Sequence, residues 1–217
     1  MRLEGAIFDL DGTLTDSMDI WDRAPRDLVR QFGASPPAHL AEDIKEMGRR
    51  EAAEYLAARF GLPCTPEQLM AGINELVTVE YRERVPMKPG ADRLLERLAA
   101  LGVPCGIATA SEAFQARDAM VRLGLWKHFL FAFSSLQYGS KRGPNLYLAA
   151  ARSLGSAPAR TQVFEDALHA ARTAKEAGFL VAGVYDPSAQ ADQEALRAVC
   201  DWYLSRLDDA AFLAQLG

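Results

Sequence analysis

The sequence has few cysteines and no long uninterrupted apolar run. Its three cysteines, Cys64, Cys105 and Cys200, lie far apart and form no CxxC pair, so their spacing indicates neither a disulfide framework nor a zinc site. Such a chain is typical of a reducing compartment. No apolar stretch approaches the roughly 20 residues of a membrane-spanning helix, and acidic residues interrupt the N-terminal segment before a signal peptide could form. We therefore expect a cytoplasmic protein without a membrane partner.

An excess of positive charge is also absent. The 217 residues include 24 Lys and Arg against 29 Asp and Glu, which gives a formal net charge of -5. Non-specific binding to nucleic acid or to anionic membranes relies on positive charge, so neither is an expected partner. An anionic substrate must then be held by a few local cations or by a bound metal. The composition does not address oligomeric state, and a monomer is the default expectation.

Short apolar segments alternate with amphipathic ones along most of the chain. The apolar segments predict strands at residues 6–10, 103–109, 129–134, 162–164 and 180–185, and helical patterns lie between them at 91–101, 112–123, 145–154 and 167–177. Strands that alternate with helices predict the α/β class, here a Rossmann-like parallel sheet core with helices on both faces. In such sheets, ligands bind at the carboxyl ends of the strands.

The stretch from residue 17 to residue 85 breaks this alternation. It contains helical patterns at 17–31, 49–60 and 66–84 and no convincing strand, and Thr65 is a suitable N-cap for the last helix. We expect an inserted α-helical domain at residues 16–86, with residues 1–15 and 87–217 forming the Rossmann-like core.

The strongest chemical signal is Asp9-Leu10-Asp11-Gly12-Thr13, directly after the first predicted strand. Strand alternation puts Asp9 and Asp11 on the same side of the backbone. One carboxylate can attack phosphorus to form an aspartyl phosphate, and a second can donate a proton to the leaving oxygen. The alternative is an acidic turn that closes a strand, because Asp-Gly is a common turn pair.

A hydroxyl follows the second predicted strand. Thr109 ends that strand, and its hydroxyl together with the backbone N–H groups at Ala110 and Ser111 can bind a phosphoryl oxygen. The alternative is an ordinary helix start, for which Ser111 is the better N-cap candidate.

Charged residues complete the set at two later points. Lys141 lies in a loop before a helix, where it either balances Asp9 and a phosphate or is simply a solvated charge. Glu165 and Asp166 follow the fourth predicted strand and offer hard oxygen ligands of the kind that Mg²⁺ prefers. An acidic pair at the start of a helix is the alternative reading of these two residues.

Together, the order of DxDGT, Thr, Lys and Glu-Asp resembles the haloacid dehalogenase superfamily of phosphotransferases, over nearly the whole chain. Within it, the chain most resembles the branch that contains beta-phosphoglucomutases and small-metabolite phosphatases. The resemblance implies that the helical insertion is a mobile cap. It also implies that Asp9 is the nucleophile and a Mg²⁺ ligand, and that Asp11 is the general acid/base and gives its backbone carbonyl to the metal.

The resemblance further implies that Thr109, Ala110 and Lys141 hold the phosphoryl group. Asp166 would bind Mg²⁺ directly, with Glu165 as a ligand or as its supporting partner. The sequence departs from the family pattern at Ala167 and Ala170, which stand where Ser and Gly are usual, and in the loop Lys141-Arg142-Gly143-Pro144-Asn145, where Lys-Pro-x-Pro-Asp is usual.

The function implied is that of a Mg²⁺-dependent phosphatase of a small phosphorylated metabolite, with a sugar phosphate as the expected substrate. Asp11 favours phosphorus chemistry, because the dehalogenases of the superfamily lack this second aspartate. A sugar-phosphate mutase is the alternative enzyme, and a non-catalytic relative that binds a metabolite is the alternative from a different class.

Two cap residues resemble the substrate loop of the mutases, whose pattern is about Lys-Gly-x-x-Arg. Lys45 and Arg49 match it, and Glu46 stands in place of the glycine. The resemblance implies that they contact the substrate, and the alternative is a solvated face of a charged helix. Trp21 stands where the mutases carry a cap histidine, which favours the phosphatase.

Overall fold

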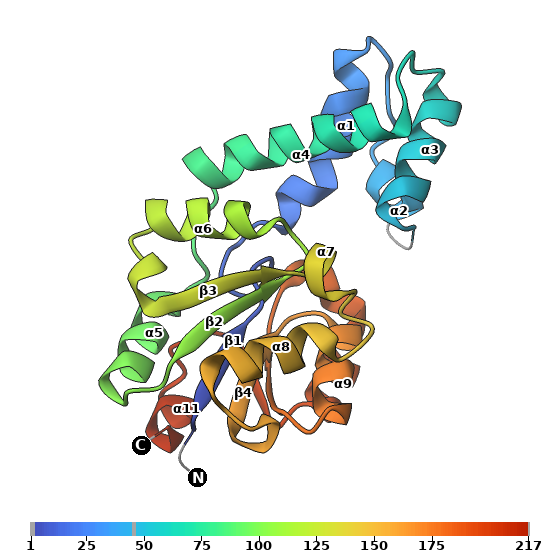
Figure 1. Cartoon of the computed structure of the whole chain (residues 1–217). Helices are drawn as coiled ribbons and strands as arrows, with labels where there is room; N and C mark the ends of the chain where they lie inside the picture. The colour runs from blue at the N-terminus through green and yellow to red at the C-terminus, as the bar shows by residue number, and fades with distance from the viewer. Residues whose placement is uncertain (1–2, 45–46, 217) are drawn as a thin grey trace. The chain divides into compact units, whose positions relative to one another are not determined.

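A six-stranded parallel sheet forms the centre of the larger part of the chain (Figure 1). The computed structural model describes residues 3–44 and 47–216. The strand order is β3-β2-β1-β4-β5-β6, and every neighbouring pair is parallel. The strands are β1 (Gly5–Phe8), β2 (Cys105–Thr109), β3 (Phe129–Ser134), β4 (Thr161–Glu165), β5 (Leu180–Val184) and β6 (Trp202–Leu204). The predicted α/β class is confirmed.

The strand β6 was not predicted from the sequence. This strand has three residues, and Gly183 of β5 pairs with its central residue, Tyr203. Trp202 and Tyr203 are only partly buried, so the segment shows neither a continuous apolar run nor a full period of alternation. Its pairing with β5 therefore has no local signal in the sequence.

Helices cover both faces of the sheet because strand alternation divides the apolar side chains between the faces. Ile7 and Val163 belong to a buried cluster that also contains Tyr147 of α8. Phe8 and Phe164 stack at 4.4 Å, and Phe212 of α11 packs edge-on against Phe164 at 5.7 Å. The helices of this part are α5 (Ala91–Ala100), α6 (Ala113–Arg122), α7 (Ser135–Tyr138), α8 (Asn145–Leu154), α9 (Leu168–Glu176), α10 (Gln193–Val199) and α11 (Ala210–Gln215).

A second compact unit, Ser17–Arg84, consists of helices with a core of their own. Its helices are α1 (Met18–Gln31), α2 (Leu40–Ile44), α3 (Arg49–Phe60) and α4 (Pro66–Glu83). Their buried side chains form one apolar cluster that includes Leu28, Leu40, Leu56 and Leu69. Burial of a helical face in such a cluster supplies most of the stability of short helices.

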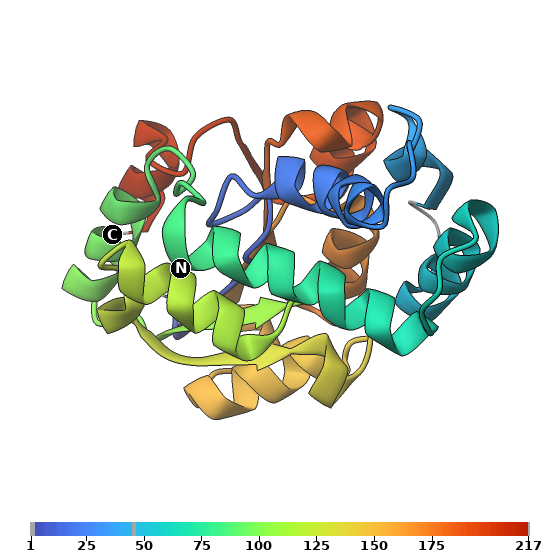
Figure 2. The same cartoon turned by 90° about the horizontal axis from the view of Figure 1, so that it is seen from above.

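Local sequence accounts for the start of the longest helix in this unit. The Thr65 hydroxyl accepts a hydrogen bond from the Gln68 N–H, and the Gln68 side chain accepts one from the Thr65 N–H, so the predicted N-cap is confirmed. Helices α1 and α4 lie side by side (Figure 2), and Trp21 donates a hydrogen bond of 3.2 Å to the Tyr81 hydroxyl.

Within residues 3–44 and 47–216, no helix is both long enough and apolar enough to cross a membrane. A cytoplasmic location and a monomeric state stay predictions.

Candidate active site

The side chain of Asp9 lies in a buried ion pair at the carboxyl end of β1. Its backbone N–H donates to the Phe164 carbonyl at 3.0 Å, and the residue is 5% exposed. The Lys141 ammonium donates a hydrogen bond to Asp9 Oδ1 and another, of 2.6 Å, to Glu165 Oε1. Lys141 itself is 7% exposed. The loop before α8 therefore places the Lys141 ammonium group at the carboxyl ends of β1 and β4.

Three carboxylates gather around this ammonium. Asp9, Glu165 and Asp166 each offer an oxygen, and these oxygens all lie within 4.8 Å of one another. Glu165 is the last residue of β4 and Asp166 follows it. Because β1 and β4 are paired neighbours in parallel register, residues that follow the two strands meet at one edge of the sheet.

The charges in this cluster are unbalanced. Burial, as the largest cause, raises the pKa of Asp9 from 3.8 to about 8, and Glu165 adds to the shift while Lys141 opposes it. Burial likewise raises the pKa of Asp166 well above its usual value. For Lys141, burial lowers the pKa, but the charges of Asp9 and Glu165 outweigh burial and raise it. The cluster therefore favours one more positive charge, either a proton or a cation.

The residues present fit a hard divalent cation. Glu165 Oε2 is buried and makes no hydrogen bond among the described residues, an orphaned acceptor that a cation would satisfy. The candidate metal ligands of Asp9, Glu165 and Asp166 are all carboxylate oxygens, and Mg²⁺ prefers oxygen ligands.

Asp11 and Thr109 are linked through Ser111. Ser111 Oγ donates to Asp11 Oδ2 at 2.6 Å, and the Ser111 N–H donates to Thr109 Oγ1 at 2.9 Å. The alternative reading, in which Ser111 is a helix N-cap, is wrong, because α6 begins at Ala113 with Glu112 at the N-cap, and the Glu112 N–H donates to the Gln115 side chain. The side chain of Ser111 is thereby available to the half-buried Asp11.

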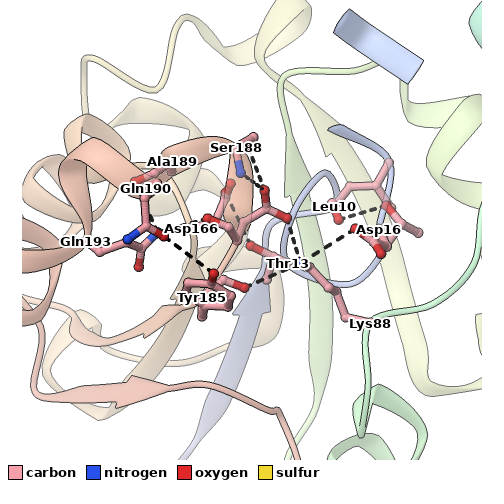
Figure 3. A network of polar contacts seen from close by, with 12 residues as sticks. Leu10, Thr13, Asp16, Lys88, Asp166, Tyr185, Ser188, Ala189, Gln190 and Gln193 are labelled. Atoms are coloured by element: carbon pink, nitrogen blue, oxygen red, sulfur yellow. Dashed lines mark hydrogen bonds and ion pairs between the residues drawn. The ribbon is translucent and has the colours of Figure 1, made fainter. Parts of the chain in front are cut away.

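A second buried ion pair lies beside the DxDGT turn (Figure 3). Lys88 Nζ contacts Asp186 Oδ2 at 2.6 Å, and Thr13 Oγ1 lies 3.5 Å from Asp166 Oδ1. Burial alone would raise the pKa of Asp186, but the hydrogen bonds from Lys88 and Ser188 outweigh it and lower that pKa. This pair was not predicted from the sequence, because its members are 98 residues apart.

Tyr147 was also missed. It is fully buried on α8, and its hydroxyl donates to Glu165 Oε1 at 2.6 Å. Burial, followed by the charge of Glu165, raises the pKa of this hydroxyl well above 10.0. A tyrosine in an otherwise apolar helical stretch is the signal that was available, because a buried hydroxyl needs a partner.

The structure therefore gathers Asp9, Lys141, Glu165 and Asp166 in one buried cluster. Arg49 is the exposed first residue of α3 in the helical unit. Lys45 lies outside the described residues. Ala110 is exposed directly after β2, and its predicted role stays a prediction.

Comparison with known proteins places this architecture in a family. The haloacid dehalogenase-like hydrolase family matches residues 6–184. Hexitol phosphatase A of Escherichia coli K12 is 30% identical over 87% of this chain and 86% of its own length. The phosphorylated carbohydrates phosphatase of Thermotoga maritima is 26% identical over 81% of this chain and 82% of its own length.

Solved structures agree on the fold. A putative beta-phosphoglucomutase from Thermotoga maritima superposes with a TM-score of 0.81 at 24% identity and covers 100% of both chains. CbbY from Rhodobacter sphaeroides in complex with phosphate has a TM-score of 0.81 at 21% identity and covers 98% of this chain and 100% of its own. Since the family match runs from β1 to the end of β5, the chain belongs to the haloacid dehalogenase-like hydrolase family.

Proposed function

We propose that the protein is a Mg²⁺-dependent phosphatase of small phosphorylated metabolites, with sugar phosphates as the substrate class. The observation that carries this proposal is the buried cluster of Asp9, Lys141, Glu165 and Asp166 at the carboxyl edge of the sheet. Relatives named for hexitol and carbohydrate phosphates support the substrate class.

In the first step, an Asp9 oxygen forms a bond to phosphorus while the bond from phosphorus to the alcohol oxygen breaks. The Asp11 carboxyl group gives its proton to that leaving oxygen. Lys141 is already paired with Asp9, and its charge offsets the negative charge of the transferring group.

In the second step, water attacks the phosphorus of the aspartyl phosphate. Asp11, now a carboxylate, accepts the proton of the water, the Asp9 carboxylate is regenerated, and inorganic phosphate leaves. The Thr109 hydroxyl, the Ala110 backbone N–H and Lys141 hold the phosphoryl oxygens during both steps.

The carboxylates of Asp9, Glu165 and Asp166, together with the Asp11 backbone carbonyl, would hold Mg²⁺. When bound, the metal supplies positive charge that offsets the charge of the phosphoryl oxygens. The orphaned Glu165 Oε2 supports this assignment.

The helical domain, residues 16–86, is proposed to act as the cap that selects the substrate, with Lys45 and Arg49 as its contacts. The Arg49 guanidinium lies over the Trp21 ring, 5.9 Å from the ring centroid. This contact is of the cation–π type and orders a long side chain. Trp21 in place of the cap histidine of the mutases supports hydrolysis over phosphoryl transfer between sugar oxygens.

The decisive experiment measures release of inorganic phosphate from p-nitrophenyl phosphate and a panel of sugar phosphates, with and without Mg²⁺. Asp9→Asn should abolish turnover, and Asp11→Asn should lower kcat by about 10²–10⁴-fold. The matched control is Asp192→Asn. Asp192 is an exposed aspartate with no role in the proposed site, so this variant should remain active. Isomerisation with little phosphate release would replace the proposal with a mutase. Absence of turnover in the wild type, with all substrates, would favour a binding role.

A further inference from the structure

The hydroxyl of Tyr147 contacts a carboxylate of the proposed metal site from inside the hydrophobic core. Tyr147 is on α8, and its ring belongs to the cluster that packs α8 and α9 against the sheet. The ring lies 6.2 Å from that of Phe179. These apolar neighbours hold the ring in place, so the hydroxyl has a defined position 2.6 Å from Glu165 Oε1.

Two side chains among the described residues donate hydrogen bonds to Glu165, and both donate to the same oxygen. Lys141 Nζ and the Tyr147 hydroxyl each donate to Oε1 at 2.6 Å. Oε2 is equally buried and accepts no hydrogen bond from any described residue. Two donors that converge on one oxygen from different elements prevent the carboxylate from rotating, because a rotation would break both bonds.

This arrangement gives the two carboxylate oxygens of Glu165 different roles, one as a hydrogen-bond acceptor and the other as a candidate metal ligand. Oε1 is occupied by protein donors, which leaves Oε2 as the oxygen without a hydrogen bond on a carboxylate that lies in one cluster with Asp9 and Asp166. Lys141 alone could not enforce this, since it also donates to Asp9 and moves with any change in that carboxylate. Tyr147 is the donor that contacts Glu165 independently of Asp9.

We propose that Tyr147 is a positioning residue for the metal site, and that its hydroxyl orients the Glu165 carboxylate so that Oε2 accepts the cation. This inference rests on the proposed Mg²⁺-dependent function. Partners that orient metal ligands in this way typically contribute 10–100-fold to metal affinity.

The test compares Tyr147→Phe with Tyr203→Phe. Both substitutions remove one hydroxyl from a partly or fully buried tyrosine of the same unit, and the Tyr203 hydroxyl donates to Gln193 rather than to a proposed ligand. MgCl2 is titrated into metal-free protein by calorimetry, without substrate, and circular dichroism and urea unfolding record the fold and stability of each variant.

The expected result is that Tyr147→Phe raises the Mg²⁺ dissociation constant about 10-fold, while Tyr203→Phe leaves it within twofold of the wild type. In activity assays, saturating Mg²⁺ should restore most of kcat in Tyr147→Phe without a change in the KM for the phosphorylated substrate. Should Tyr147→Phe not fold, Tyr147→Met serves as the second hydroxyl-free variant, because methionine adapts to irregular core gaps.

Equal Mg²⁺ affinity in wild type and Tyr147→Phe would overturn the inference, even if the variant were less stable, because a purely structural hydroxyl changes stability alone. An equal loss of affinity in Tyr203→Phe would also overturn it. A wild-type protein that binds no Mg²⁺ would instead refute the proposed function, so the two failures are distinguishable.

Discussion

Ser111 Oγ donates a hydrogen bond of 2.6 Å to Asp11 Oδ2, although the two residues are 100 positions apart in the sequence. Ser111 is itself held in place, because its carbonyl accepts a hydrogen bond of 2.7 Å from the Ser134 hydroxyl. The carboxyl ends of β1, β2 and β3 are therefore linked through one serine. The proposed general acid is oriented by a hydroxyl that the sheet itself positions.

We predict that Ser111→Ala lowers kcat/KM for sugar phosphates about 10-fold, an effect of the size expected when one hydrogen bond is lost. With p-nitrophenyl phosphate the loss should be much smaller, since that leaving group departs without a proton. Steady-state kinetics with both substrates measure the difference. Equal losses with both substrates would contradict a role that acts through Asp11.

A glycine is required at position 12. Gly12 has a φ of 82°, and a Cβ added there would lie 2.8 Å from Cγ of Asp166, with its Oδ2 closer still. Gly12→Ala should therefore combine a backbone cost of about 1–2 kcal/mol with displacement of a proposed metal ligand. We expect a lower Tm and at least 10-fold weaker Mg²⁺ binding, measured by calorimetry.

The control for this substitution is Gly178→Ala. Gly178 has a φ of 87°, and an added Cβ would have no heavy atom within 4 Å. It should show the backbone cost alone, with unchanged Mg²⁺ affinity. A loss of Mg²⁺ affinity in both variants would mean that the effect is not local to the site.

The metal-free protein should become less stable as the pH rises. The pKa of Asp9 is raised from 3.8 to about 8 by burial, so the folded state binds a proton that the unfolded state has released. The free energy of unfolding then falls as the pH rises from about 4 to about 8. Urea unfolding across this range, without metal, measures the slope.

Two comparisons test the origin of that slope. Asp9→Asn should reduce the slope, because it removes one of the two carboxyl groups, Asp9 and Asp166, whose pKa burial raises. Saturating Mg²⁺ should reduce it in the wild type, since a cation favours the carboxylate over the protonated acid. A wild-type stability that rises with pH over this range, without metal, would contradict the charge imbalance described for the site.

The ion pair between Lys88 and Asp186 should matter more for stability than an exposed pair. Its side chains are 8% and 1% exposed, and Lys88→Met would leave a buried carboxylate without its cation. We expect a loss of about 3–5 kcal/mol in the free energy of unfolding. Because the pKa of Asp186 is lowered, the contribution of the pair is present above about pH 4 and is lost as the pH falls below that value.

The double variant Lys88→Met/Asp186→Leu should recover much of this loss, because it leaves no unpaired charge. The exposed pair between Arg160 and Glu4, at 2.7 Å with side chains 47% and 39% exposed, supplies the control. Arg160→Met should cost less than about 1 kcal/mol. If Lys88→Met and Arg160→Met lowered the free energy of unfolding equally, burial would not make the Lys88 pair more important for stability than an exposed pair.

Much of the architecture was predictable because it depends on local patterns. The apolar segments that became β1 to β5 and the capping residues at Thr65 are readable within a window of a few residues. The strand β6 was not, because it has only three residues, two of which are partly buried, and so shows no pattern of its own. The alternative reading of Ser111 as a helix N-cap rested on the same kind of local signal, and only the position of Asp11 shows that its hydroxyl has a different partner.

By itself, the sequence determined the order of β1 to β5 and of the longer helices, and the chemical character of the residues that follow these strands, because both depend on side-chain type and short-range spacing. Only the tertiary structure decided which of those residues meet. Parallel pairing of β1 with β4 brings Asp9 to Glu165 and Asp166, and the packing of α8 brings Tyr147 to Glu165. Contacts between residues that are 18 to 153 positions apart in the sequence depend on how the sheet and helices pack, which no local pattern encodes.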